Sequence, residues 1–186
     1  RVRAPKSAFG RRGRQADQDG TKDDLVTLEP IVKNTAWPDE EATQACALRL
    51  AQCKAIQNAL IELHGDLGAG KTTWVRHLLR ALGVTGRIKS PTYGVVESHQ
   101  GTWQGYALPI WHFDFYRLND PREWAEAGLR DTLTERGLRL VEWPTQAGAM
   151  RPQADLALTI ECQDHEQRWV HWQAMTEAGR RLLESA

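Results

Sequence analysis

Residues 65–72 read Gly-Asp-Leu-Gly-Ala-Gly-Lys-Thr, a complete G-x-x-x-x-G-K-[ST] phosphate-binding loop. An apolar run at 59–63 precedes the loop, and a segment patterned as a helix, 71–82, follows it. A glycine-rich bend turns successive backbone N–H groups toward phosphate oxygens, and the following helix adds the positive end of its dipole. This order predicts an α/β domain that binds a nucleoside triphosphate. The alternative is a glycine-rich turn before an ordinary helix.

Two side chains at the end of this loop carry its specific chemistry. Lys71 is placed to reach the β- and γ-phosphates, and the hydroxyl of Thr72 is placed to bind Mg²⁺. Gly83 follows the helical pattern at the position of a C-terminal cap. We therefore expect a helix that begins beside the phosphates and ends just before this glycine.

Length and composition favour one compact domain. The chain has 186 residues, of which 41% are hydrophobic and 26% are charged, which suits a globular fold with a sizeable core. No apolar run approaches the length of a membrane span, and the basic N-terminus lacks the apolar stretch of a secretory signal. The three cysteines, Cys46, Cys53 and Cys162, form no metal-binding pattern. These features predict a reduced, cytoplasmic protein without a membrane partner.

The N-terminal segment differs from the rest of the chain. Six basic residues precede the first acid, Asp17: they are Arg1, Arg3, Lys6, Arg11, Arg12 and Arg14. Because residues 1–24 contain almost no apolar side chains, we expect a disordered basic arm there, followed by an ATPase domain at 25–186. The arm is either a contact for RNA or an acidic partner, or a solvated tail.

The remaining pattern alternates between strands and helices. Pro38 and the acids at 39–41 open a helix of about fifteen residues. Strands are expected at 59–63, 93–99, 108–116, 138–143, 154–162 and 168–174, and short helices at 121–127 and 176–183. The strands on either side of 100–101 and of 164–165 look like hairpins. The chain is therefore expected to form a parallel core with antiparallel additions.

Two acids stand where apolar segments end. Asp114 closes the run Ile-Trp-His-Phe-Asp, and Glu142 closes the run Leu-Arg-Leu-Val-Glu. The carboxyl ends of parallel strands meet beside the ligand crevice, and Mg²⁺ prefers oxygen ligands. One acid is expected to help hold the metal while the other orients or deprotonates the attacking water. Which acid has which role is open. The alternative for each is a structural carboxylate that bonds backbone amides.

The segment 89–93, Lys-Ser-Pro-Thr-Tyr, lies where P-loop hydrolases carry a mobile element that senses the γ-phosphate. Pro91 disfavours helix at Ser90, which leaves the hydroxyl of Thr92 placed to reach metal or phosphate. A rigid turn that leads into a strand is the alternative interpretation.

Four segments occur in the order GDLGAGKTT, KSPTY, HFDFYRL and VEWP. In this order and spacing, residues 37–174 resemble the TsaE (YjeE) family of bacterial P-loop ATPases. The resemblance implies the three-layer α/β fold of P-loop NTPases, with a mixed, mainly parallel sheet. It also implies a slow ATPase that serves in making threonylcarbamoyladenosine beside the anticodon of tRNA. Two partner proteins are implied as well: TsaD, which transfers the threonylcarbamoyl group, and TsaB.

The same resemblance implies roles for individual residues. ATP and Mg²⁺ are the implied cofactors, with the metal held by Thr72 and Glu142 and catalysis assigned to Asp114, Glu142 and Thr92. The implied nucleotide contacts are Gly65, Asp66, Gly68, Ala69, Gly70, Lys71, Thr72 and Thr73, with Pro38 and Glu40 near the adenine.

The favoured function is therefore an ATP-binding, slowly hydrolysing subunit of tRNA threonylcarbamoylation. We expect it to contact tRNA indirectly or weakly, and not to bind DNA. One alternative is a small-molecule kinase, which needs an acceptor pocket and an arginine-bearing lid; Arg117, Arg122 and Arg130 form no evident lid in the sequence. The other alternative is an assembly factor that binds ATP without hydrolysing it.

Overall fold

The computed structural model describes residues 29–186 except 92, 127 and 165. The predicted basic arm, 1–24, and Thr92 lie outside these described residues. The strands are β1 (Ile31–Trp37), β2 (Leu60–His64), β3 (Val96–Trp103), β4 (Tyr106–Asp114), β5 (Leu138–Glu142), β6 (Leu156–Cys162) and β7 (Arg168–Ala174). The helices are α1 (Glu40–Gln52), α2 (Lys71–Ala81), α3 (Pro121–Glu126), α4 (Leu129–Thr134) and α5 (Glu177–Ser185), with 3₁₀ helices η1 (Lys54–Asn58) and η2 (Pro144–Met150).

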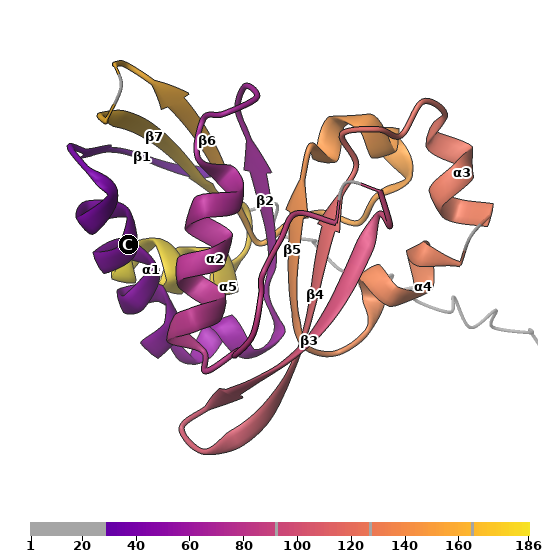
Figure 1. Cartoon of the computed structure of the whole chain (residues 1–186), viewed down its shortest axis with the longest axis horizontal. Coiled ribbons are helices and arrows are strands. Elements are labelled where there is room, and N and C mark those ends of the chain that lie inside the picture. Colours follow the sequence, from indigo (N-terminus) through magenta and orange to yellow (C-terminus); the bar gives the residue numbers. More distant parts are fainter. Residues whose placement is uncertain (1–28, 92, 127, 165) are drawn as a thin grey trace, which may run out of the picture.

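The seven strands form one mixed sheet in the order β1-β7-β6-β2-β5-β4-β3. The four central strands, β6, β2, β5 and β4, run parallel, and the outer strands β1, β7 and β3 are antiparallel to their neighbours. This arrangement confirms the predicted parallel core with antiparallel additions. It also brings the carboxyl ends of β2, β5 and β4 to one edge of the sheet (Figure 1).

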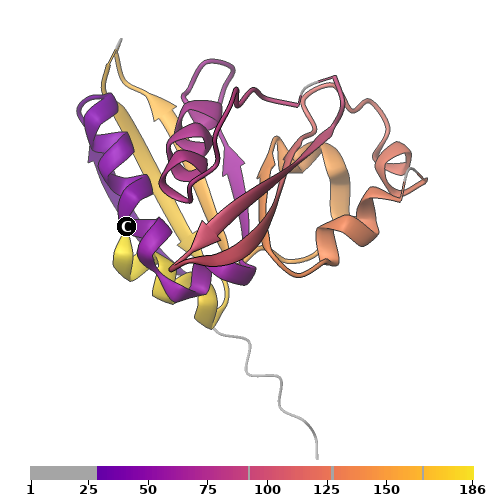
Figure 2. The same cartoon turned by 60° about the horizontal axis from the view of Figure 1, so that its bottom comes forward.

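Helices cover both faces of the sheet, as the three-layer fold requires. Figure 1 and Figure 2 show α1, α2 and α5 grouped together, apart from α3 and α4. The side chains of β2 alternate accordingly: Ile61 and Leu63 belong to the core under α1, α2 and α5, while Leu60 belongs to a second core with Phe113 and Val141. The apolar residues of β2 thus lie on both faces, because both faces of this central strand are buried.

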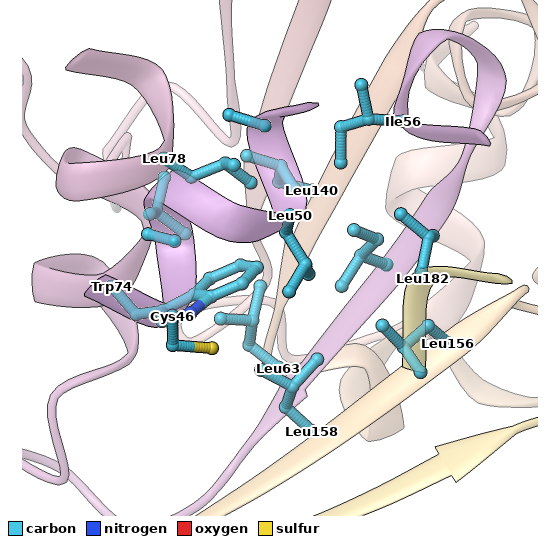
Figure 3. Packing of buried hydrophobic residues seen from close by; sticks show 14 of the residues in the cluster. Cys46, Leu50, Ile56, Leu63, Trp74, Leu78, Leu140, Leu156, Leu158 and Leu182 are labelled. Carbon is cyan, nitrogen blue, oxygen red and sulfur yellow. The ribbon is translucent and has the colours of Figure 1, made fainter. Parts of the chain in front are cut away.

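Packing in the larger core fixes the start of α2. Trp74, in the first turn of α2, is fully buried and lies beside Cys46 of α1, with Leu50 and Leu78 close by (Figure 3). Full burial of a side chain such as Leu78 stabilises the fold by about 2 kcal/mol. Because this packing starts directly after the phosphate-binding loop, it holds the end of the loop against the sheet.

The β3–β4 hairpin turns at Gln104 and Gly105, so the turn expected at 100–101 was misplaced. Both turn residues have positive φ, 48° and 85°, which is what a two-residue hairpin loop of type I′ requires. Gly101 instead lies within β3, where a Cβ would stand 2.7 Å from Ile110 Cδ1 and 3.0 Å from the Leu82 carbonyl oxygen. Close contacts with Ile110 of β4 and with Leu82, the residue that follows α2, require this glycine; a turn does not.

Other elements match the sequence prediction less completely. β1 was not predicted, because of its seven residues only Trp37 is buried, which leaves no clear apolar alternation. β3 begins at Val96 and not at residue 93, because the amides of Gly94 and Val95 both bond the carbonyl of Pro91 in a turn. Among the helices of the described residues, none is long and apolar enough to cross a membrane.

Candidate active site

The phosphate-binding loop connects β2 to α2, as its motif predicts. Gly65 follows β2 with a φ of 127°, and a Cβ at this position would overlap the carbonyl oxygen of Ile160 in the neighbouring strand β6. Gly70 forms the N-cap of α2 with a φ of 108°, a conformation that favours glycine. The helix then begins at Lys71, so the dipole of α2 points its positive end into the loop.

Lys71 is held by the loop itself and by an aromatic ring. Its Nζ donates to the carbonyl oxygens of Gly65 at 2.7 Å and Asp66 at 2.8 Å, and lies 4.0 Å from the centroid of the Trp143 ring. Burial lowers the pKa of Lys71, while the carboxylates of Glu142, Asp114 and Asp66 oppose this shift. The ammonium therefore sits in a desolvated position, close to the acids that the sequence singled out.

Glu142 is the last residue of β5 and is 2% exposed. Both of its carboxylate oxygens accept the hydroxyl of Thr72 at 2.9 Å, and Oε1 also lies 2.8 Å from His112 Nε2. The predicted metal pair, Thr72 and Glu142, is therefore brought into direct contact across the gap between α2 and the sheet.

Asp114 is the last residue of β4 and is the register partner of Glu142 in the parallel pair β4–β5. Its carboxylate accepts the hydroxyl of Ser90 and, at 2.9 Å, the amide of Tyr116. Its own amide donates to the carbonyl oxygen of Val95 at 2.9 Å. The 89–93 segment predicted to sense the γ-phosphate is thus tied to one acid, Asp114.

Two cavities meet at the loop. The smaller, about 220 Å³, is lined by Lys71, Thr72, Asp114, Glu142 and Trp143, among others. The larger, about 520 Å³, lies on the α1 side. Gly68 and Gly70 of the loop and Thr73 in the first turn of α2 line both cavities. This arrangement suits a ligand with a phosphate tail at one end and a larger group at the other.

The remaining predicted residues are less uniformly placed. Ala69 and Glu40 line the larger cavity, although Glu40 also bonds His77 on α2 at 2.9 Å. Pro38 is exposed and does not line this cavity. Gly65 and Asp66 instead face a separate hollow behind the loop, beside β6.

Several polar residues at the site were not predicted from the sequence, and Ser90, His112, Glu166 and Arg168 are among them. Arg168, at the start of β7, donates from Nε to the Ala69 carbonyl at 3.0 Å, and with Glu166 it lines the larger cavity. No sequence signal points to these two residues, because the sheet order alone brings β7 near the loop. The position of His112 could have been inferred from the sequence, because a residue two positions before Asp114 lies on the same face of the strand.

The chemistry of the site fits Mg²⁺ bound together with phosphates. Within the described part of the chain, no group of three or more His, Cys, Asp or Glu side chains is arranged to hold a metal alone. Thr72 and Glu142 offer oxygen ligands next to the phosphate-binding loop. Mg²⁺ is commonly held in this way, by one or two protein oxygens and the phosphates of its substrate.

Known proteins resemble this chain in sequence and fold. Residues 37–170 match the family described as threonylcarbamoyl adenosine biosynthesis protein TsaE. The tRNA threonylcarbamoyladenosine biosynthesis protein TsaE of Haemophilus influenzae is 38% identical over 136 residues, which cover 73% of this chain and 81% of that protein. The protein of the same name from Bacillus subtilis is 31% identical over 82% of this chain and 94% of its own length.

A solved structure agrees with the sequence matches. The crystal structure of Bacillus subtilis YdiB superposes with a TM-score of 0.64 at 28% identity, covering 83% of this chain and 94% of that one. The fold, the motifs and these similarities lead to one assignment. The chain belongs to the TsaE family of proteins involved in tRNA threonylcarbamoyladenosine biosynthesis.

Proposed function

We propose that this chain binds ATP with Mg²⁺ and hydrolyses it slowly, as a subunit required for threonylcarbamoyladenosine modification of tRNA beside the anticodon. We propose TsaB and TsaD as its partners, with tRNA contacted indirectly or weakly. The observation that carries the ATPase proposal is the convergence of Lys71, Thr72, Asp114 and Glu142 on one cavity of about 220 Å³. Family membership supports the tRNA-modification part of the proposal.

The contacts in this cavity suggest a division of roles. Lys71 binds the β- and γ-phosphates together with the loop amides. Thr72 and Glu142, already hydrogen-bonded to each other, hold Mg²⁺, which when bound neutralises charge that develops on the phosphates. Asp114, the register partner of Glu142, orients and deprotonates the attacking water. The ring of Trp143 over Lys71 limits access of bulk water.

The larger cavity is proposed to take the nucleoside. Its lining combines Trp37, Glu40, Glu166 and Arg168 with the loop. The volume of about 520 Å³ lies within the range typical of small-molecule sites. Arg168 connects this cavity to the phosphate-binding loop through the Ala69 carbonyl.

The decisive experiment measures phosphate release from ATP by the purified chain, alone and with TsaB and TsaD. We expect slow release alone and clear stimulation only when both partners are present. Release that does not respond to the pair, together with transfer of labelled phosphate to an added metabolite, would show a small-molecule kinase instead.

Variants separate hydrolysis from binding. Asp114→Asn and Glu142→Gln keep the size of each side chain while removing its charge. We expect ATP binding to persist in Asp114→Asn while hydrolysis and tRNA modification are both lost. If tRNA modification continues at the normal level in both variants, the chain acts as an assembly factor that needs ATP bound but not cleaved.

A further inference from the structure

The buried side chain of His112 contacts Glu142, the acid proposed to hold the metal, and does not line the cavity. His112 lies on β4 and is 0% exposed, and its Nε2 stands 2.8 Å from Oε1 of Glu142. Glu142 in turn accepts the hydroxyl of Thr72. The three side chains form a continuous hydrogen-bonded chain that starts inside the sheet and ends at the first turn of α2.

The direction of these hydrogen bonds follows from their chemistry. A carboxylate only accepts, so His112 donates from Nε2, and Nδ1 is then left as an acceptor. Nδ1 has no hydrogen-bond partner among the described residues. Within the part of the chain that the structure describes, the hydrogen bond to Glu142 is therefore the single one that this buried ring makes. A leucine would fill the same space without leaving any polar atom buried, so core packing alone does not explain a histidine here.

The contact restricts how Glu142 can point. The contact with Thr72 alone does not distinguish the two carboxylate oxygens, because both lie at the same 2.9 Å from that hydroxyl. The bond from His112 distinguishes the two oxygens, since it occupies Oε1 alone. Oε2 accepts only the shared hydroxyl of Thr72, so it is the oxygen with more capacity to accept a ligand in the cavity that Glu142 and Thr72 line.

We propose that His112 is a positioning residue that orients Glu142 toward Thr72 and the metal of the bound nucleotide. This inference rests on the proposed Mg²⁺-dependent ATP binding. His112 does not line either cavity of the site, so it acts through Glu142 and not by touching the nucleotide. Outer hydrogen-bond partners of this kind commonly change metal affinity by about 10-fold or more when they are removed.

Three substitutions of the full chain test the role. His112→Leu removes the donor and keeps the volume. His112→Gln places an amide NH₂ near the position of Nε2, whereas His112→Asn places its NH₂ near the position of Nδ1. His99→Leu is the matched control, because His99 is a histidine of the adjacent strand β3 whose Nε2 is buried without a hydrogen-bond partner among the described residues.

The measurement is calorimetric binding of a non-hydrolysable ATP analogue, once with Mg²⁺ and once with EDTA, alongside thermal unfolding. In the wild type and His99→Leu we expect Mg²⁺ to increase the affinity. In His112→Leu and His112→Asn we expect that increase to shrink by about 10-fold, with the affinity in EDTA unchanged. His112→Gln should recover most of the increase.

Several results would overturn the inference. They are an unchanged Mg²⁺ effect in His112→Leu and His112→Asn, an equal loss of affinity in both buffers, or a glutamine variant no better than the asparagine variant. If His112→Leu fails to fold, the comparison of His112→Gln with His112→Asn still tests the inference. A wild-type chain that binds the analogue equally in both buffers would overturn the proposed function itself, and this inference with it.

Discussion

The ammonium of Lys71 lies 4.0 Å from the centre of the Trp143 ring. Trp143 directly follows the acid Glu142 in the sequence. Trp143 adopts a left-handed backbone conformation, with φ 57° and ψ 45°, that a large side chain rarely takes. The ring of Tyr116 packs against the indole with the centroids 4.9 Å apart. The ring over the lysine is thus held by backbone geometry and by a second aromatic side chain.

This contact predicts a graded effect of ring size on hydrolysis. A cation–π contact of this kind stabilises by about 1 kcal/mol, roughly fivefold in an equilibrium constant. We expect Trp143→Ala to slow phosphate release by at least about fivefold, and Trp143→Phe to slow it less, because a smaller ring remains over Lys71. Steady-state phosphate release in the presence of TsaB and TsaD measures both variants. Equal rates for alanine and phenylalanine would rule out a role for the aromatic face.

An ion pair between a buried carboxylate and a partly exposed arginine connects the strand before the loop to the segment after η2. Oε1 of Glu62 in β2 accepts a hydrogen bond from Arg151 Nε at 2.7 Å. Oε2 of the same carboxylate lies 3.0 Å from His64 Nε2. Burial raises the pKa of Glu62, but the hydrogen bonds from His64 and Arg151 outweigh it, so the pKa is lowered below its ordinary value of 4.5. The pair therefore stabilises the fold above pH 4.5, and this contribution is lost as the pH falls through the lowered pKa.

We accordingly expect Arg151→Met to reduce the free energy of unfolding by about 2 kcal/mol near neutral pH, because it leaves a buried carboxylate with one partner fewer. The difference in the free energy of unfolding between this variant and the wild type should shrink as the pH falls below 4.5 and through the lowered pKa of Glu62. Urea unfolding at a series of pH values measures this. Arg122→Met is the control, since its pair with Asp120 is exposed and should contribute nothing measurable. A constant difference at all pH values would contradict the assignment.

Gly65 should be the least replaceable glycine of the loop. It combines a positive φ with a backbone carbonyl, that of Ile160, where a Cβ would lie. Gly86 also has a positive φ, 80°, but a Cβ there would meet open space. We expect Gly86→Ala to destabilise by about 1 kcal/mol and Gly65→Ala by about 3 kcal/mol or more, with loss of ATP binding only in the latter. Denaturant titration and calorimetry compare the two, and equal losses of stability would contradict this prediction.

The cysteines should differ strongly in reactivity. Burial raises the pKa of the Cys46 thiol to about 11, whereas Cys162 is exposed. Because the thiolate is the reactive form, iodoacetamide near pH 8 should label Cys162 first and Cys46 only after unfolding. Mass spectrometry of timed samples resolves the order. Rapid labelling of Cys46 in the native protein would show that α1 separates readily from α2.

The parts of the site that could be predicted are those encoded locally. The loop 65–72 is a contiguous motif, and Asp114 and Glu142 stand out because each ends an apolar run. Arg168 could not be found in this way, since it reaches Ala69 only because β7 pairs with β6, which lies next to β2. That neighbour relationship is a property of the sheet order, which local patterns do not contain.

The errors in the fold prediction have equally specific causes. Gly101 resembled a turn residue, yet its missing side chain serves close packing against Leu82 and Ile110. β1 escaped notice because an exposed edge strand lacks the apolar alternation that identifies buried ones. Both cases concern residues whose environment is created by distant parts of the chain.

The β3–β4 hairpin extends away from the edge of the sheet where the phosphate-binding loop lies, so Gln104 and Gly105 stand far along the strands from Asp114 (Figure 1). Extra residues inserted at this tip, such as a peptide epitope, should leave the rate of phosphate release from ATP unchanged. One extra residue between His112 and Asp114 would have the opposite effect. It would turn the acid to the other face of the sheet, because side chains alternate along a strand.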